Sequence, residues 1–184
     1  MASGSHDTSI KLWDLTEGKC INILSGHIDC ITNLIKVTDN LIASGSNDSS
    51  IKIWDLTVGK CINTLNGHND CVLSLIKVAH DIIASGSYDN SIKLWDLTGG
   101  KCIKTLTGHS DCIWSLVKLN DNIIASGGDD NSIKLWDLND GKCINTLTGH
   151  NNGITSLLKI NDNLIAIGSK DNSIKLWESR IEIK

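Results

Sequence analysis

The chain has 184 residues, of which 40% are hydrophobic and 21% are charged, and its net charge is −4. These values are typical of a globular domain with a sizeable core. No apolar run is long enough to span a membrane, and the mildly acidic balance argues against a nucleic-acid binder that relies on bulk positive charge. We therefore expect neither a membrane nor a nucleic acid as partner.

One short sequence organises the whole chain. The heptapeptide SIKLWDL at 91–97 recurs with small changes, and its tryptophans are 41 residues apart. They are Trp13, Trp54, Trp95, Trp136 and Trp177. A fixed period of this length indicates a repeat architecture, because each unit buries its apolar surface only against its neighbours. We predict a single domain, 1–184, with a partial repeat, three whole repeats and a truncated repeat, at 1–25, 26–66, 67–107, 108–148 and 149–184.

The whole copy at 67–107 shows the elements expected in every repeat. In chain order, strands are predicted at 71–78, 82–87, 91–96 and 101–106. Alternating apolar and β-branched residues indicate the strands, and the Asn, Asp and Gly residues between them indicate tight turns. Because the connections are short, neighbouring strands should pair antiparallel and form a four-stranded meander without helices. The expected fold class is therefore all-β.

The seven cysteines also follow the period. An odd number at repeat spacing argues against a disulfide framework, and we interpret them as small hydrophobic residues in a reducing compartment. Because no secretory signal is visible at the N-terminus, we expect an intracellular, cytoplasmic protein. One set could form a thiolate ring for a soft metal, but its members lie in different repeats, so neither metal nor cofactor is expected. The two sets are Cys20, Cys61, Cys102 and Cys143, and Cys30, Cys71 and Cys112.

The repeat resembles the WD40 family, whose members fold as β-propellers. The resemblance rests on Gly-His and Trp-Asp pairs that each recur 41 residues apart, and on ASGS or ASGG stretches before an Asp-containing turn. The Gly-His pairs stand at 26–27, 67–68, 108–109 and 149–150, and the Trp-Asp pairs at 13–14, 54–55, 95–96 and 136–137. The resemblance covers essentially the whole chain. It implies a WD40-type β-propeller of four-stranded antiparallel blades, with about 4.5 repeats of 41 residues.

The resemblance also implies a hydrogen-bonded tetrad of His, Ser, Asp and Trp in each blade. Carried onto this sequence, the sets are His27, Ser44, Asp48 and Trp54; His68, Ser85, Asp89 and Trp95; and His109, Ser126, Asp130 and Trp136. The last copy keeps a further set without the Ser: His150, Asp171 and Trp177. Ile167 stands at the Ser position there, which removes a hydroxyl and puts this tetrad in doubt.

A Ser, a His and an Asp in contact could also form a nucleophilic triad. This set recurs in every copy, whereas a catalytic site is normally singular. We therefore do not expect an enzyme, and we interpret the histidines as structural groups.

Positions that differ between copies are where a partner could be recognised. In the WD40 family such positions line the top face around the central channel. Here they are Thr32, Leu73, Trp114 and Thr155 after the Gly-His pair, and Asn47, Tyr88, Asp129 and Lys170 before the turn Asp. We expect Tyr88, Leu73, Trp114 and Asp129 to meet on adjacent blades, which would suit a peptide with an apolar or basic side chain. The alternative is drift between copied repeats, with Trp114 merely filling a gap.

The number of blades is fewer than the roughly seven of a typical ring, and the first and last repeats are incomplete. Residues 181–183 could add at most a short fourth strand to the last blade. One hypothesis is that two copies associate end to end as a homodimer, in a larger ring of about eight to ten blades. A compact five-unit monomer and a fragment of a longer protein are the other possibilities.

The expected function is a non-enzymatic scaffold that binds a protein or peptide on the top face of the propeller. One alternative is a small-ligand or glycan-binding propeller, which would need similar residues at the pocket position of each blade. Another is a self-assembling propeller fragment.

Overall fold

The computed structural model describes residues 1–178 of the chain. Within this range every regular element is a strand, and no helix is present that could cross a membrane. The strands are β1 (Ala2–Gly4), β2 (Ile10–Asp14), β3 (Lys19–Leu24), β4 (Ile31–Lys36), β5 (Leu41–Ser46), β6 (Ile51–Asp55), β7 (Lys60–Leu65), β8 (Val72–Ala79), β9 (Ile82–Ser87), β10 (Ser91–Asp96), β11 (Lys101–Thr107), β12 (Ile113–Lys118), β13 (Ile123–Gly128), β14 (Ile133–Asp137), β15 (Cys143–Leu147), β16 (Ile154–Asn161), β17 (Leu164–Ser169) and β18 (Ile174–Glu178).

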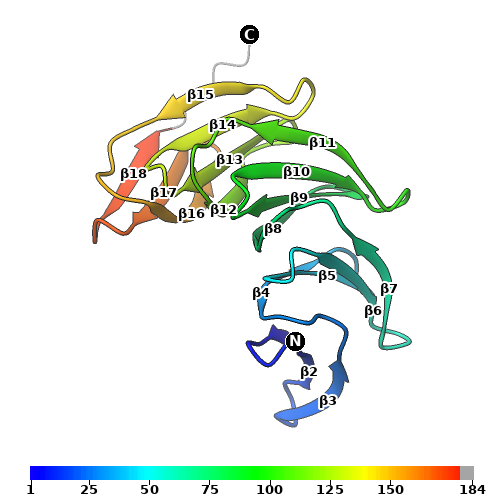
Figure 1. The fold of residues 1–184 in the computed structure, drawn as a ribbon. Coiled ribbons are helices and arrows are strands. Elements are labelled where there is room, and N and C mark those ends of the chain that lie inside the picture. The colour runs from blue at the N-terminus through cyan, green and yellow to red at the C-terminus, as the bar shows by residue number, and fades with distance from the viewer. Residues whose placement is uncertain (179–184) are drawn as a thin grey trace.

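The strands form five antiparallel meanders, which we call blades one to five. Blades two, three and four have four strands each, namely β4–β7, β8–β11 and β12–β15. Blade one (β1–β3) and blade five (β16–β18) have three described strands. Figure 1 shows the blades following one another along an arc, with blades one and five at its two ends. The all-β propeller architecture and the meander order are as predicted; the predicted addition at 181–183 lies outside the described residues.

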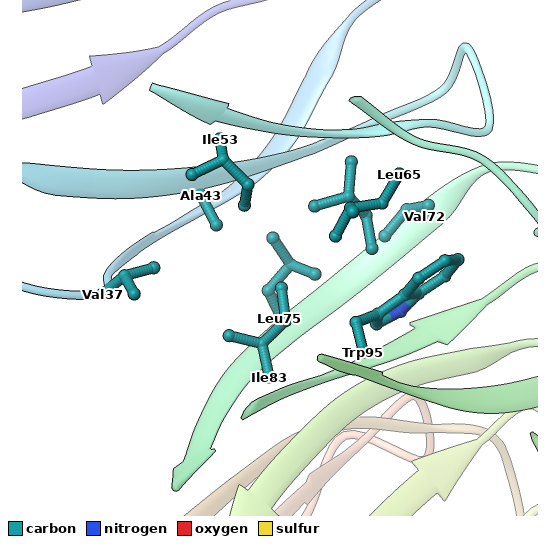
Figure 2. Close-up of a cluster of buried hydrophobic side chains, with 9 residues drawn as sticks. Val37, Ala43, Ile53, Leu65, Val72, Leu75, Ile83 and Trp95 are labelled. Atoms are coloured by element: carbon teal, nitrogen blue, oxygen red, sulfur yellow. The ribbon is translucent and has the colours of Figure 1, made fainter. Parts of the chain in front are cut away.

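The core lies between the blades. Blade two contributes Val37 and Ile53, and blade three covers them with Leu75 and Trp95 (Figure 2). All four side chains are buried. A buried Trp removes about 150–250 Å² from water, which stabilises the fold by roughly 4–6 kcal/mol as an upper estimate. Each blade is therefore stable only beside its neighbours.

Polar contacts also join neighbouring blades at fixed repeat positions. Ser74 Oγ accepts a hydrogen bond from the Leu116 backbone N–H at 3.1 Å, which links blade three to blade four. The Lys77 ammonium donates to the Val37 carbonyl at 2.5 Å, which links blade three back to blade two. The same two contacts recur between blades four and five. These contacts fix the offset between blades as well as their separation.

The turn before each Trp strand needs a residue in the left-handed region. Asn90, Asn131 and Asn172 occupy this position in the last three blades, with φ between 63° and 65°. Asn tolerates such a φ because its short amide bonds locally to the backbone. Thr8 (φ 69°) and Ser49 (φ 67°) stand at the same position in the first two blades. Thr and Ser tolerate a positive φ less well than Asn, so the residues at this position suit the backbone less well in the first two blades.

Four of the seven cysteines are placed differently from the interpretation above. Cys20, Cys61, Cys102 and Cys143 are exposed on the outermost strands. Each thiol donates to the backbone carbonyl two residues further on, at 3.2–3.4 Å. They lie at the register shift beside each Trp strand, so they are surface residues of a bulge and contribute little to the core.

Candidate functional site

Each of the three complete tetrads is a continuous hydrogen-bond chain. In blade two, Trp54 Nε1–H donates to Ser44 Oγ at 2.8 Å, and Ser44 Oγ lies 2.7 Å from His27 Nε2. His27 Nδ1 lies 2.7 Å from an Asp48 carboxylate oxygen. Because a carboxylate only accepts, Nδ1 carries the proton and Nε2 accepts from the Ser hydroxyl.

The same distances recur in the next two blades. His68, Ser85, Asp89 and Trp95 are joined at 2.6–2.8 Å, and so are His109, Ser126, Asp130 and Trp136. The three Ser hydroxyls are completely buried. They cannot reach a substrate, so these Ser–His–Asp sets bind the strands of each blade together.

Burial and hydrogen bonding set the charges of the tetrads. Burial lowers the pKa of His27, His68 and His109 below the usual value, although the neighbouring carboxylates oppose this. Burial alone would raise the pKa of Asp48, but hydrogen bonds from Ser50, His27 and the backbone outweigh it and lower the pKa to about 2. The pKa of Asp89 is likewise lowered to about 2. The tetrads are therefore neutral His beside ionised Asp.

The last tetrad is broken where the sequence departs from the pattern. His150 Nδ1 keeps its contact with Asp171 at 2.7 Å. Ile167 offers no hydroxyl, and within residues 1–178 both His150 Nε2 and Trp177 Nε1 are buried without a hydrogen-bond partner. Ile167 packs instead among the apolar residues between blades four and five. One apolar residue thus replaces the centre of the network.

Four of the predicted top-face residues meet on blades three to five, and we call them the top-face cluster: Tyr88, Trp114, Asp129 and Lys170. The Lys170 ammonium lies 4.9 Å from the centroid of the Trp114 ring and 2.6 Å from an Asp129 carboxylate oxygen. The Tyr88 ring meets the Trp114 ring edge-on, with centroids 6.4 Å apart. The cluster therefore holds a cation between an aromatic face and a carboxylate.

The shape of blade five fits this cluster. Gly153 stands where the other copies have Cys30, Cys71 and Cys112. A Cβ atom at Gly153 would lie 2.1 Å from an Asp129 carboxylate oxygen, so a side chain there would displace the carboxylate. The replacement of Cys by Gly thus provides the space that Asp129 occupies.

The charges of the cluster are stabilised by one another. Burial alone would raise the pKa of Asp129, but contacts with Lys170, Trp114 and Cys112 outweigh it and lower the pKa. The hydrogen bond to Asp129 raises the pKa of Lys170. Burial, together with Asp129, raises the pKa of Cys112 to about 12, so this thiol stays protonated and donates to Asp129 at 3.3 Å. A protonated thiol is a poor metal ligand.

The remaining predicted top-face residues are Thr32, Thr155, Leu73 and Asn47. Thr32 donates to the backbone carbonyls of Gly45 and Val72, and Thr155 donates to the Gly168 carbonyl at 3.2 Å. Leu73 is half-buried on β8, and Asn47 accepts from the Cys71 thiol through its backbone carbonyl at 3.6 Å. Thr32 and Thr155 therefore have structural contacts of their own.

Sequence reasoning missed the contact of Lys170 with both Trp114 and Asp129. The signal was present, because Asp129 and Lys170 occupy the same repeat position in successive copies and carry opposite charges. Equivalent positions on neighbouring blades lie side by side, so opposite charges there can pair.

Comparisons with known proteins agree with this architecture. The family model described as WD domain, G-beta repeat matches residues 1–14, 18–55, 59–96, 100–137 and 141–178. The crystal structure of the WD40 beta propeller domain of Doa1 is similar over 98% of this chain, with a TM-score of 0.89 and 29% identity. This chain covers 60% of that propeller chain, which is less than two thirds.

A curated relative shares a shorter stretch. The CCR4-associated factor 4 homolog of Vanderwaltozyma polyspora is 59% identical over 34 residues, which is 18% of this chain and 5% of that protein. The family match, by contrast, extends over all five blades. The chain therefore belongs to the WD40 repeat family of β-propeller proteins.

Proposed function

We propose that this chain is a non-enzymatic platform for peptide recognition and that a partner docks on the top-face cluster. WD40 propellers are generally scaffolds for protein interaction. The observation that carries the proposal is the position of the Lys170 ammonium, over Trp114 and against Asp129. The Lys170 ammonium thus already occupies the Trp114 ring face and the Asp129 carboxylate, which are the groups that a basic side chain of a partner would contact.

The chemistry of the cluster favours one kind of partner. A Lys or Arg of a peptide would replace Lys170 between the ring and the carboxylate, and an apolar side chain would lie against the Tyr88 and Trp114 rings. Tyr88 is 48% exposed, so an aromatic surface is accessible. Lys170 has more than two fifths of its side chain exposed, so its exchange needs no rearrangement of the blades.

Two features favour a built site over drift between copies. Trp114 makes contacts with both Tyr88 and Lys170, so it does more than fill a gap. Gly153 is also matched to the Asp129 carboxylate that lies against it. The corresponding positions of other blades differ in size and polarity, which argues against a glycan site repeated in each blade.

A selection from a random peptide library on the immobilised chain tests this proposal. We expect the enriched peptides to carry Lys, Arg or large apolar residues and to lose at least tenfold in affinity for Trp114→Ala. For basic peptides, Lys170→Ala should increase affinity, because the competing ammonium is removed. Ile103→Ala, on the exposed outer strand β11, is the control and should change nothing. Unchanged affinity for Trp114→Ala would contradict the proposal.

A second candidate is self-association through blade five. Ile174 and Leu176 are 77% and 65% exposed, whereas their counterparts in blade four, Ile133 and Leu135, are 0% and 4% exposed beneath blade five. A homodimer would cover this apolar face. Since one chain covers 60% of the matched propeller chain, a ring of two copies would need a wider curvature than that propeller.

Sedimentation velocity tests the homodimer. A dimer should form at micromolar concentration and dissociate for Ile174→Glu, whereas Ile21→Glu, on the exposed outer strand β3, should leave it intact. A monomer for the unsubstituted chain would rule this candidate out. We further propose an intracellular location, which the seven free cysteines support.

A further inference from the structure

The two oxygens of the Asp129 carboxylate are hydrogen-bonded unequally in the top-face cluster. Oδ2 accepts from the Lys170 ammonium at 2.8 Å and from the Cys112 thiol at 3.3 Å. Oδ1 lies 2.6 Å from the same ammonium, but within residues 1–178 it is buried and no donor is directed at it as a hydrogen bond. A buried acceptor without a directed donor is costly, so the cluster leaves one carboxylate oxygen unsatisfied.

The shape of an ammonium accounts for this inequality. The three N–H groups of a Lys ammonium point away from one another, so a single ammonium cannot direct a straight hydrogen bond to each oxygen of one carboxylate. The guanidinium of Arg is flat and carries pairs of parallel N–H groups that match the two oxygens. An Arg side chain in the place of the Lys170 ammonium would therefore donate to both Oδ1 and Oδ2 of Asp129.

The aromatic side of the cluster favours the same group. The Lys170 ammonium lies 4.9 Å from the centroid of the Trp114 ring. A guanidinium at this place can stack flat on the ring, and it is more weakly hydrated than an ammonium, so it loses less when it leaves water. Trp114 and Asp129 together thus match a planar cation better than a compact one.

The charge around the cluster attracts cations. In blades two to five the Gly-His turn and the turn before the Trp strand lie at the same end, because a backbone hydrogen bond joins them in each blade. Asp29, Asp70 and Asp111 stand in the Gly-His turns of blades two, three and four. Lys170 is the only Lys or Arg in these eight turns. The turns are 26–30, 67–71, 108–112 and 149–153, and 46–50, 87–91, 128–132 and 169–173.

We infer that the top-face cluster recognises arginine in preference to lysine, with the guanidinium paired to both oxygens of Asp129 and stacked on Trp114. This inference rests on the proposed docking of a peptide at the cluster and names the residue that the site selects. Lys170 is then a poorer substitute for that arginine within the chain itself. Its ammonium satisfies only one oxygen of Asp129, so an incoming guanidinium displaces it.

Three labelled peptides test the preference. Each is a fluorescein-labelled GSGLXLGSG peptide in which X is arginine, lysine or citrulline, and citrulline has the shape of arginine without its charge. We expect fluorescence anisotropy to show about tenfold tighter binding for arginine than for lysine, and the weakest binding for citrulline. Equal affinity for arginine and lysine would overturn the inference and leave the docking proposal standing. Failure of all three peptides to bind would contradict the docking proposal and this inference together.

Two matched substitutions separate the paired oxygens from general charge. Asp129→Asn removes one acceptor oxygen and should reduce the preference for arginine over lysine to within about threefold. Asp111→Asn removes the same charge at the same end and can still accept from the Cys112 backbone N–H, so it should weaken both peptides equally. Circular dichroism checks that both variants fold. A preference that survives Asp129→Asn, or that both variants reduce equally, would overturn the inference.

A third substitution tests the same geometry while keeping Asp129. Lys170→Arg supplies the guanidinium from within the chain and should weaken binding of the arginine peptide about threefold or more, because a better competitor holds the carboxylate. Lys134→Arg is the control: Lys134 lies on β14 and donates to Thr146 at 3.2 Å, so the affinity should not change. Unchanged affinity for Lys170→Arg would mean that ammonium and guanidinium compete equally and would overturn the inference.

Discussion

Blades three and five are built from related repeats but differ in how well their buried polar groups are satisfied. In blade three, Trp95 and His68 both bond the Ser85 hydroxyl. In blade five, Ile167 replaces that Ser and leaves a buried N–H and a buried ring nitrogen without partners. A single hydroxyl therefore decides whether the four groups act as a network or as a pair plus two unsatisfied atoms.

The two blades also differ in apolar burial. Ile92 and Leu94 of blade three are buried beneath blade four, whereas Ile174 and Leu176 of blade five are exposed. The sequence is the same, so burial depends on the neighbour and not on the residue type. Interior blades should consequently be the most stable part of the chain, as in other repeat proteins.

Replacing the tetrad histidine should give the largest difference between blades three and five in the free energy of unfolding. His68→Ala leaves Asp89, Ser85 and Trp95 with broken contacts and should lower the free energy of unfolding by about 3 kcal/mol. His150→Ala removes a residue with one good contact and should cost about 1 kcal/mol. Urea unfolding followed by circular dichroism measures both. Equal costs would show that the Ser hydroxyl contributes nothing to the network.

Acid should weaken the complete tetrads in two stages. The histidines of blades two to four have a lowered pKa, so the unfolded chain binds more protons, and stability falls as the pH drops below about 6.5. The carboxyls of Asp48 and Asp89 have a pKa of about 2 in the fold, so a further loss follows between about pH 4 and pH 2. Each carboxyl should contribute about 1–2 kcal/mol after allowance for solvent screening.

Melting temperatures measured from pH 8 to pH 2 test this order. Asp89→Asn should remove part of the decline below pH 4, since an amide does not titrate. A melting temperature that rises on acidification through pH 6.5 would contradict the charge states assigned to the tetrads.

Restoring the hydroxyl should make blade five behave like blade three. Ile167→Ser gains hydrogen bonds with His150 and Trp177 but loses a buried apolar side chain, so the free energy of unfolding should change by no more than about 1 kcal/mol. The informative quantity is the coupling free energy between the two substitutions, Ile167→Ser and His150→Ala. In the Ile167→Ser background, His150→Ala should cost about 1 kcal/mol more than in the original chain. Purely additive effects would mean that the network does not re-form.

The smallest effect concerns the turns of blades two and three. Ser49 has a φ of 67°, where blade three has Asn90 at 64°. Ser49→Asn should therefore stabilise the chain by about 0.5 kcal/mol, because Asn tolerates the left-handed region better. Asn90→Ser is the matched change and should destabilise it by a similar amount. Thermal unfolding detects both, and shifts in the same direction would exclude backbone strain as the cause.

The sequence predicted the features that depend on a single repeat. The 41-residue spacing of Trp95 and its counterparts predicted the blades, and short turns predicted antiparallel meanders. Contacts across blades were harder, because they depend on the offset between neighbouring sheets. The stacking of Lys170 on Trp114 and the exposure of the cysteines on the outermost strands were therefore missed.

The recurring contacts between Ser74 and Leu116 and between Lys77 and Val37 have a consequence for how such a chain can change in length. Each of these hydrogen bonds joins two residues that are 40 to 42 positions apart, and each connects only two neighbouring blades. A 41-residue unit could be duplicated or deleted starting from any position of the repeat. The blades on both sides of the change would then face each other through the same repeat positions as before. Growth and shrinkage by whole units therefore need no new interface, which makes recombination between copies structurally tolerable.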